Sequence, residues 1–409
     1  MAARAETPGF DLTVHANQRP QEGRFNLVHA SDVEGPIFLG DDARDIVSKF
    51  VRPPQPKDGI DYGAIFYDEV HCAIKEEYMN KGLGQIGSNI VLYLPALLYF
   101  GATDRRLLMQ ALQSRRTPGS SDHIGYLRSK NSYLVAVTTA WKEPHAKMVL
   151  ENERAYAGFD ELAATDFPID EIRDRMQDDN SGNWHREMAM TGRWLHKIFA
   201  LIEKRAETTD PAAKAELTER LKGKIIDFYK KEVGITWNAQ GQTISFHLTQ
   251  LGDEIAKLNV IGDYGKAVVV RRLVRQNLLQ PDAPGVIVWG DGVNDATMLG
   301  DSEGATWRVA FNGSQAARTA NIGVISEEIG RPGIVLTQIF EEHFKKYKER
   351  RPDRNQIAEV VNEAQARVGK DIIIHVAGPE TDHGLLEEHE KMKTKIRGPR
   401  ASTIDNLHV

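Results

Sequence analysis

The residue types best suited to chemistry are gathered in residues 286–295, which read Val-Ile-Val-Trp-Gly-Asp-Gly-Val-Asn-Asp. The apolar, β-branched run that ends at Gly290 predicts a buried parallel strand, so the polar residues after it lie at the carboxyl end of that strand. Open α/β sheets bind their ligands at this edge. Asp291 and Asp295 supply carboxylate oxygens, which Mg²⁺ takes as ligands together with water and substrate phosphate. The stretch therefore predicts a magnesium site, with the amide of Asn294 beside it.

An acidic turn follows a second apolar stretch near the start of the chain. Residues 25–31 predict a short strand, and Gly35 and Pro36 end it. Asp32 and Glu34 are left at the tip of this strand, which makes both of them candidate site residues.

Two hydroxyl groups and a lysine are weaker candidates. Residues 133–137 predict another buried strand, and Thr138 and Thr139 follow it. Hydroxyls in that place can hold an anion, but they can equally cap a following helix, and both roles remain open. Lys266 opens a predicted helix over residues 267–276, where a lysine is usually solvated. Its role depends on whether it lies beside the acidic residues.

Other patterns favour structural roles. Residues 82–87 have the glycine spacing of a dinucleotide loop, but a predicted helix precedes them, so we expect a loop between helices. His185 and His196 have no cysteine or histidine partner at ligand spacing. The charged helix that carries His383, Glu387 and His389 is expected to present a solvated face, because these residues lack the spacing of a catalytic zinc motif.

The elements that must position these residues alternate between strand and helix, which predicts an α/β fold built on a doubly wound, Rossmann-like parallel sheet. Helical periodicity over two long intervals predicts a helical cap and an additional helical insertion. Residues 322–325 are expected to form the last strand. The expected organisation is an N-terminal tail (1–24), core with the first strand (25–40), helical cap (41–132), core (133–167), helical insertion (168–235), core (236–330), and a charged helical C-terminal region (331–409) that is frayed from residue 391.

Composition excludes several classes of function. A single cysteine, Cys72, excludes a disulfide framework and a cysteine-based zinc site, so we expect an intracellular, cytoplasmic protein. A formal net charge of −6 over 409 residues argues against nucleic acid as the main partner. Residues 1–21 lack the features of a signal peptide, and the longest apolar run, 90–100, is too short to span a bilayer. The C-terminal region could bind a protein partner, and the oligomeric state stays open.

The order of these features is more specific than any one of them. Asp32-x-Glu34, then Thr138, then Lys266, then Gly290-Asp-Gly-Val-Asn-Asp295 resembles the four motifs of the haloacid dehalogenase-like (HAD) superfamily, and the last is similar to its phosphoserine phosphatase-like members. A closer resemblance is to archaeal HAD-like proteins associated with energy-converting hydrogenase (subunit R-like). It rests on the local patterns at residues 31–36, 94–103, 166–170 and 309–313, and it extends over roughly residues 25–325.

The resemblance implies a phosphohydrolase that acts through an aspartyl-phosphate. Asp32 would be the nucleophile, and Mg²⁺ would be held by Asp32, the backbone carbonyl of Glu34 and Asp291, with support from Asp295. Thr138, with Thr139 beside it, would bind phosphate oxygens. Lys266 would balance the negative charge, and Asn294 would orient the site.

Glu34 departs from the superfamily, whose hydrolytic members have aspartate two residues after the nucleophile. That residue protonates the leaving oxygen and then activates water, and glutamate is longer by one methylene. We therefore expect a Mg²⁺-dependent phosphohydrolase of a small phosphorylated metabolite. The alternatives are a slow or inactive HAD-like protein that serves in binding or assembly, and a phosphotransferase or phosphomutase. Asp291 and Asp295 argue against a dehalogenase, which needs no metal.

Overall fold

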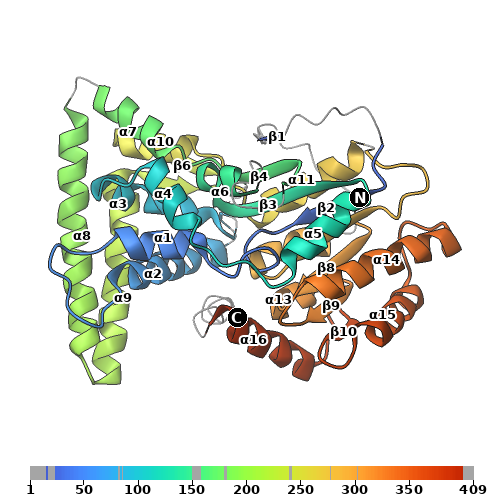
Figure 1. Ribbon diagram of the computed structural model, residues 1–409. Coiled ribbons are helices and arrows are strands. Elements are labelled where there is room, and N and C mark those ends of the chain that lie inside the picture. The colour runs from blue at the N-terminus through green and yellow to red at the C-terminus, as the bar shows by residue number, and fades with distance from the viewer. Residues whose placement is uncertain are drawn as a thin grey trace.

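The computed structural model describes residues 15–16, 24–81, 83–84, 86–149, 158–178, 182–238, 242–276, 278–301 and 303–398. Within these residues the centre of the molecule is an eight-stranded sheet (Figure 1). β1 and β10, at its two edges, run antiparallel to their neighbours, and the other adjacent strands are parallel. The strand order is β1 (His15–Ala16), β4 (Glu161–Thr165), β3 (Ser132–Trp141), β2 (Leu27–Ser31), β7 (Val286–Gly290), β8 (Trp307–Phe311), β9 (Ile322–Ile325) and β10 (Ile373–Val376).

The three strands that carry the expected site lie side by side. β2 pairs with β3 on one side and with β7 on the other, both in parallel, and all residues of the three strands are buried. Their sequences are apolar on both faces, as expected for parallel strands in the middle of a sheet, which are covered on both faces. The carboxyl ends of β2, β3 and β7 therefore meet at one edge.

Helices cover both faces of the sheet, as the fold class requires. On one face, Leu336 and Phe340 of α14 pack against the sheet together with residues of α5 and α15. On the other, Val270 and Leu273 of α11 do so with residues of α12 and of the C-terminal helix α16. The bounds are α5 (Ser120–Ser129), α11 (Asp263–Arg275), α12 (Ala296–Gly300), α13 (Ser314–Ala317), α14 (Gly330–Tyr347), α15 (Arg354–Val368) and α16 (His383–Arg397).

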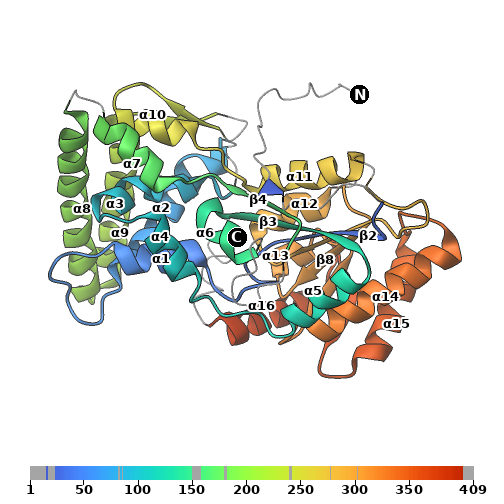
Figure 2. The same ribbon diagram turned by 45° about the horizontal axis from the view of Figure 1, so that its top comes forward.

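The cap and the insertion form one helical body with a shared apolar core, seen at the left of Figures 1 and 2. Trp194 of the insertion stacks on Phe228 with ring centroids 3.9 Å apart, and it meets Phe66 of the cap edge to face at 5.5 Å. The elements are α1 (Asp42–Phe50), α2 (Tyr62–Glu77), two 3-10 turns (Met79–Lys81 and Ser88–Tyr93), α3 (Leu94–Tyr99), α4 (Asp104–Ala111), α7 (Ile169–Asp178), α8 (Asn183–Glu207), α9 (Pro211–Asp227) and a π-helical turn (Phe228–Val233). The predicted fold class, a Rossmann-like sheet with a helical cap and insertion, is confirmed.

Elements group differently from the expected ranges in two places. α5 falls within the range expected for the cap, yet Ile124 and Leu127 pack under the sheet. The hairpin of β5 (Ile235–Trp237) and β6 (Thr243–Ser245), with α10 (Gln250–Lys257), falls largely within the expected core range but packs on the helical body. The apolar side chains of Trp237, Leu251 and Ile255 account for this, because they are buried there.

The C-terminal region differs most from the expectation of charged helices alone. β10 extends the sheet beyond β9, so residues 322–325 are not the last strand. α16 continues to Arg397 rather than fraying from residue 391, and Lys393 is buried. The expectation that His389 lies on a solvated face is also wrong, because its ring is buried. Its Nε2 lies 2.9 Å from Nε2 of His375 on β10. Leu386, His389 and Lys393, spaced by three and four residues, form the buried face of the helix.

Both predicted tails lie mainly outside the described residues. Of residues 1–24, β1 and residue 24 are described, and β1 pairs with β4. Residues 399–409 lie outside as well. In the described part of the chain, no helix combines the length and apolar character needed to cross a membrane.

Candidate active site

Asp32 lies directly after β2 and is paired with a buried lysine. Lys266, in the first turn of α11, places its Nζ 3.0 Å from Oδ1 of Asp32 and 2.7 Å from Oδ1 of Asp295. All three side chains are almost fully buried. One buried ammonium group therefore bridges two carboxylates from distant segments. Asp295 is 29 residues from Lys266 in the sequence, and Asp32 is more than 200 residues from it.

Lys266 opposes the effect of burial on Asp32. Burial raises the pKa of Asp32 well above its usual range, with Asp295 acting in the same direction and Lys266 against it. Burial alone would lower the pKa of Lys266, but Asp295 and Asp32 outweigh burial and hold this pKa above its usual value. Lys266 is thus a fixed cation, whose charge favours the ionised form of Asp32.

Asp295 shapes the acidic loop instead of pointing freely into solvent. Its Oδ2 accepts hydrogen bonds from the backbone N–H groups of Asp291 and Gly292, at 2.8 and 2.9 Å. Carboxylate oxygens of Asp32, Asp291 and Asp295 all lie within 4.8 Å of one another. Because Asp295 is committed to the loop and to Lys266, the oxygens left to face a ligand belong mainly to the other two aspartates.

The oxygen donors at this point fit a magnesium ion. Carboxylates from the ends of two adjacent strands are the hard donors that Mg²⁺ prefers. Gly35 leaves room for them, since a Cβ built there would lie 2.2 Å from Cγ of Asp291. Gly35 also has a φ of +106°, a conformation that favours glycine. The turn after β2 can therefore approach Asp291 only because residue 35 has no side chain.

The two threonines have different surroundings. β3 continues to Trp141 with an irregular register after Val137, so both threonines lie within the strand rather than after it. Thr138 is fully buried, and its Oγ1 accepts the backbone N–H of Ala140 at 3.1 Å. Thr139 lines the cavity and accepts a hydrogen bond from Nδ2 of Asn294 at 3.3 Å. Thr139 and Asn294 therefore line the cavity, and Thr138 is not among its lining residues.

Glu34 directs its carboxylate to the start of α1. Its Oε1 accepts a hydrogen bond from the backbone N–H of Asp42 at 2.7 Å, at the start of α1. Burial raises the pKa of Glu34 well above its usual range, and the nearby charges of Asp41, Asp42 and Asp32 add to the effect. The expected acid–base residue thus lines the same cavity, but the first turn of the cap holds its side chain.

Two cations that sequence analysis did not identify reach the site from α16. Lys393 donates to the backbone carbonyl of Asp291 at 3.1 Å and lies 3.2 Å from its Oδ2. Arg397 pairs with the same Oδ2 at 2.5 Å and also donates to the carbonyls of Leu39 and Gly40. A lysine on the buried face of an otherwise charged helix is the sequence signal that could have indicated this role.

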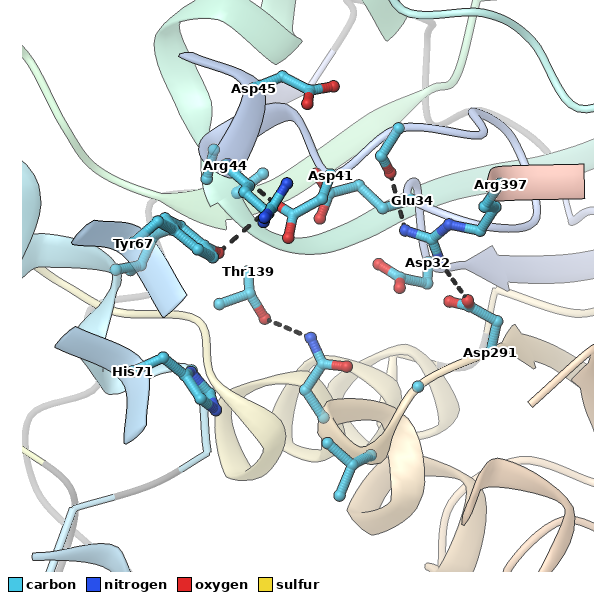
Figure 3. A pocket seen from close by; sticks show the side chains of 18 of the residues that line it. Asp32, Glu34, Asp41, Arg44, Asp45, Tyr67, His71, Thr139, Asp291 and Arg397 are labelled. Atoms are coloured by element: carbon cyan, nitrogen blue, oxygen red, sulfur yellow. Dashed lines mark hydrogen bonds and ion pairs between the residues drawn. The ribbon is translucent and has the colours of Figure 1, made fainter. Parts of the chain in front are cut away.

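A cavity of about 240 Å³ opens over these residues (Figure 3). The helical body supplies one wall, the sheet edge another, and α16 a third. Residues 86 and 87 of the glycine-rich loop lie in the wall, where Gly87 packs against Thr139; residues 82 and 85 lie outside the described residues. Among the lining side chains are Asp32, Glu34, Thr139, Asp291 and Asn294 from the sheet side, Asp41, Arg44, Tyr67 and His71 from the helical body, and Lys393 and Arg397 from α16.

Fold and site together define an α/β protein whose Rossmann-like sheet carries an acidic cluster at its carboxyl edge, under a helical cap. No family model matches the sequence, and no curated protein does. Among solved structures, gene product AF1437 from Archaeoglobus fulgidus is similar in fold, with a TM-score of 0.62, 18% identity, and coverage of 92% of this chain and 98% of that one. A phospho-aspartyl intermediate analogue of phosphoserine phosphatase matches at a TM-score of 0.38 and 10% identity, covering 74% of this chain and 93% of that one.

Proposed function

We propose that this protein is a HAD-type, Mg²⁺-dependent phosphohydrolase of a small phosphorylated metabolite. The observation that carries the proposal is the convergence of Asp32, Lys266 and Asp291, from three distant parts of the sequence, beside one cavity. Two aspartates with a buried lysine suit the transfer of a phosphoryl group, because a carboxylate can approach phosphate only when its charge is offset.

In the proposed reaction Asp32 attacks phosphorus, the P–O bond to the substrate breaks and the alcohol leaves as the aspartyl-phosphate forms. Water then hydrolyses this intermediate, which releases inorganic phosphate and restores the Asp32 carboxylate. Lys266 opposes the rise that burial causes in the pKa of Asp32, and it offsets the charge of the phosphoryl group. The N–H of Val33, which donates to Oδ1 of Asp32 at 2.8 Å, fixes the carboxylate so that Oδ2 is left to attack. Mg²⁺, held by Asp32, the Glu34 carbonyl and Asp291, would supply further charge neutralisation when bound.

Thr139 and Asn294 are the proposed phosphate-binding side chains, since they share a hydrogen bond at the cavity wall. Either can turn its polar group to a phosphate oxygen. Lys393 and Arg397 add positive charge at the opposite wall, where most other ionisable side chains are acidic. A cavity of about 240 Å³ suits a small metabolite, and these two cations favour an anionic one.

The proposal predicts that Asp32→Asn abolishes hydrolysis of p-nitrophenyl phosphate. The amide keeps the shape of the side chain but cannot form the acyl phosphate, so we expect a loss of at least about a thousandfold in kcat. A suitable control is Asp68→Asn, because Asp68 pairs with Arg44 outside the catalytic group. Phosphate release by Asp32→Asn at the rate of the wild type would exclude Asp32 as the nucleophile.

A second candidate is a slow or inactive HAD-like protein used in binding or assembly. It is favoured by two contacts: cations from α16 hold Asp291, and the N–H of Asp42 holds Glu34. A stable partner that co-purifies with the full chain, together with no phosphate release from a broad panel of phosphorylated metabolites, would favour this function. Phosphate release that depends on Asp32 would favour hydrolysis.

A further inference from the structure

Glu34 belongs to a second group of side chains of the types that bind metal ions. The other members are Asp42, the first residue of α1, and His145 of α6 (Lys142–Val149). One carboxylate oxygen of each acid and a ring nitrogen of His145 all lie within 4.8 Å of one another. Asp42 and His145 are each 1% exposed, so water cannot easily replace a missing partner.

Both ring nitrogens of His145 face oxygen acceptors. Its Nδ1 lies 2.8 Å from the backbone carbonyl of Trp141, which only accepts, so Nδ1 carries the hydrogen. In the neutral ring, Nε2 then presents a lone pair, and this atom lies 2.9 Å from Oδ2 of Asp42. Neither atom has a hydrogen-bond partner of acceptable geometry. Two acceptors that face each other in a buried place require a proton or a metal ion to bring them together.

The separation of these two atoms suits a metal ion. Nitrogen and oxygen ligands lie about 2.1 Å from such an ion, so two neighbouring ligands are about 3.0 Å apart in an octahedral shell and about 3.4 Å apart in a tetrahedral one. The ligands are also held from behind, as metal ligands usually are. His145 is oriented by the Trp141 carbonyl, and Oδ1 of Asp42 accepts a hydrogen bond from Ser114. Both atoms that face the gap are thus the ones left without other partners.

We propose that Glu34, Asp42 and His145 bind a divalent transition-metal ion, of the Zn²⁺ or Mn²⁺ type, next to the magnesium site. An imidazole ligand favours such an ion over Mg²⁺. The site also gives a reason for glutamate at position 34. In the proposed magnesium site its backbone carbonyl is a ligand, while the extra methylene lets its carboxylate reach the start of α1.

The surroundings agree with the need for a cation. The nearby guanidinium of Arg44 is engaged by both oxygens of Asp68, so it is committed elsewhere. A divalent ion would offset the negative charge that Glu34 and Asp42 bring into this buried region.

The test counts the bound metal, so its outcome does not depend on turnover. Full-length protein, stripped with chelator and kept in millimolar Mg²⁺, is titrated with Zn²⁺ by calorimetry. We expect one Zn²⁺ per chain that persists in Asp291→Asn, because that variant damages only the magnesium site. His145→Gln should weaken Zn²⁺ binding at least about tenfold. His185→Gln, on the exposed face of α8, should bind as the wild type does.

The position of the ion is decided by anomalous scattering at the zinc edge from wild-type crystals. A peak between Nε2 of His145 and Oδ2 of Asp42 supports the proposal even where a variant folds poorly. No peak there, or equal Zn²⁺ binding by His145→Gln and the wild type, overturns it and leaves a protonated His145–Asp42 ion pair. Loss of the phosphohydrolase proposal through Asp32→Asn would leave this result unchanged, since Asp32 is not a ligand of the second ion.

Discussion

Asp291 is the residue at which opposing requirements meet. As a metal ligand it must present an oxygen to a dication, yet Lys393 and Arg397 already share its Oδ2. Its remaining oxygen lies against the turn at Gly35, where no side chain intervenes. The occupancy of the proposed magnesium site should therefore depend on one glycine and two cations as much as on the aspartates.

Gly35→Ala should weaken Mg²⁺ binding sharply. The added Cβ would lie 2.2 Å from Cγ of Asp291, so either the turn or the carboxylate must move. A displacement of about 1 Å at a reacting group can cost about a hundredfold in rate, and we expect a loss of at least about tenfold in Mg²⁺ affinity and in turnover. Calorimetric titration with Mg²⁺ measures the first effect.

Gly59→Ala is the matched control for this substitution. Gly59 also has a positive φ, +79°, but a Cβ there meets no atom within 4 Å. Both variants bear the backbone strain of a left-handed residue, and only Gly35→Ala should change metal binding. Equal loss in both variants would show that strain, rather than contact with Asp291, is responsible.

At the scale of elements, α16 connects the end of the described chain to the site. It packs on one face of the sheet through Leu386, and it brings two cations to the loop after β7. Arg397 also donates to the carbonyls of Leu39 and Gly40, which precede α1. One helix thus contacts both the acidic loop after β7 and the residues that lead into the first helix of the cap.

Arg397→Gln should strengthen Mg²⁺ binding, because the guanidinium competes with the ion for Asp291. Two unit charges about 4 Å apart interact by about 1 kcal/mol even in water, and Mg²⁺ carries two charges. We therefore expect an increase in affinity of about tenfold or more, measured by calorimetry. Lys395→Gln is the control on the same helix, since Lys395 pairs with Glu327 at the surface. Unchanged or weaker Mg²⁺ binding in Arg397→Gln would show that Arg397 supports the site instead of competing for it.

At the scale of the molecule, buried histidines make stability depend on pH. Burial lowers the pKa of His123 to about 3, beneath the sheet where its ring meets His29 and Trp289. Between about pH 6.5 and this value, the unfolded chain binds a proton that the folded chain does not. The contribution of His123 to stability is therefore complete above about pH 6.5 and is lost as the pH falls.

His123→Gln should remove this part of the pH dependence. Relative to the variant, the wild type should lose about 2 kcal/mol of unfolding free energy between pH 7 and pH 5. The comparison is needed because carboxyl groups such as Glu143, whose pKa burial raises to about 7, contribute with the opposite sign. Urea unfolding at both pH values measures the difference. His383→Gln, at an exposed site, is the control and should lose as much unfolding free energy between pH 7 and pH 5 as the wild type does. An equal loss in His123→Gln would contradict the prediction.

Sequence alone determined the fold class and the acidic cluster. Apolar runs before Asp32 and Asp291 required buried parallel strands, and the carboxyl ends of adjacent parallel strands meet at one edge. Local periodicity carries this information because strand and helix formation respond to neighbouring residues. Lys266 followed from its place in the order of motifs rather than from any local pattern.

Tertiary structure decided which side chains face the cavity and which partners they have. The continuation of β3 to Trp141 brings Thr139 rather than Thr138 to the wall, and the start of α1 takes the Glu34 carboxylate. Arg397 meets Leu39 across 358 positions of sequence. No spacing encodes such contacts, because the packing of whole elements against one another fixes the position of each side chain that they carry.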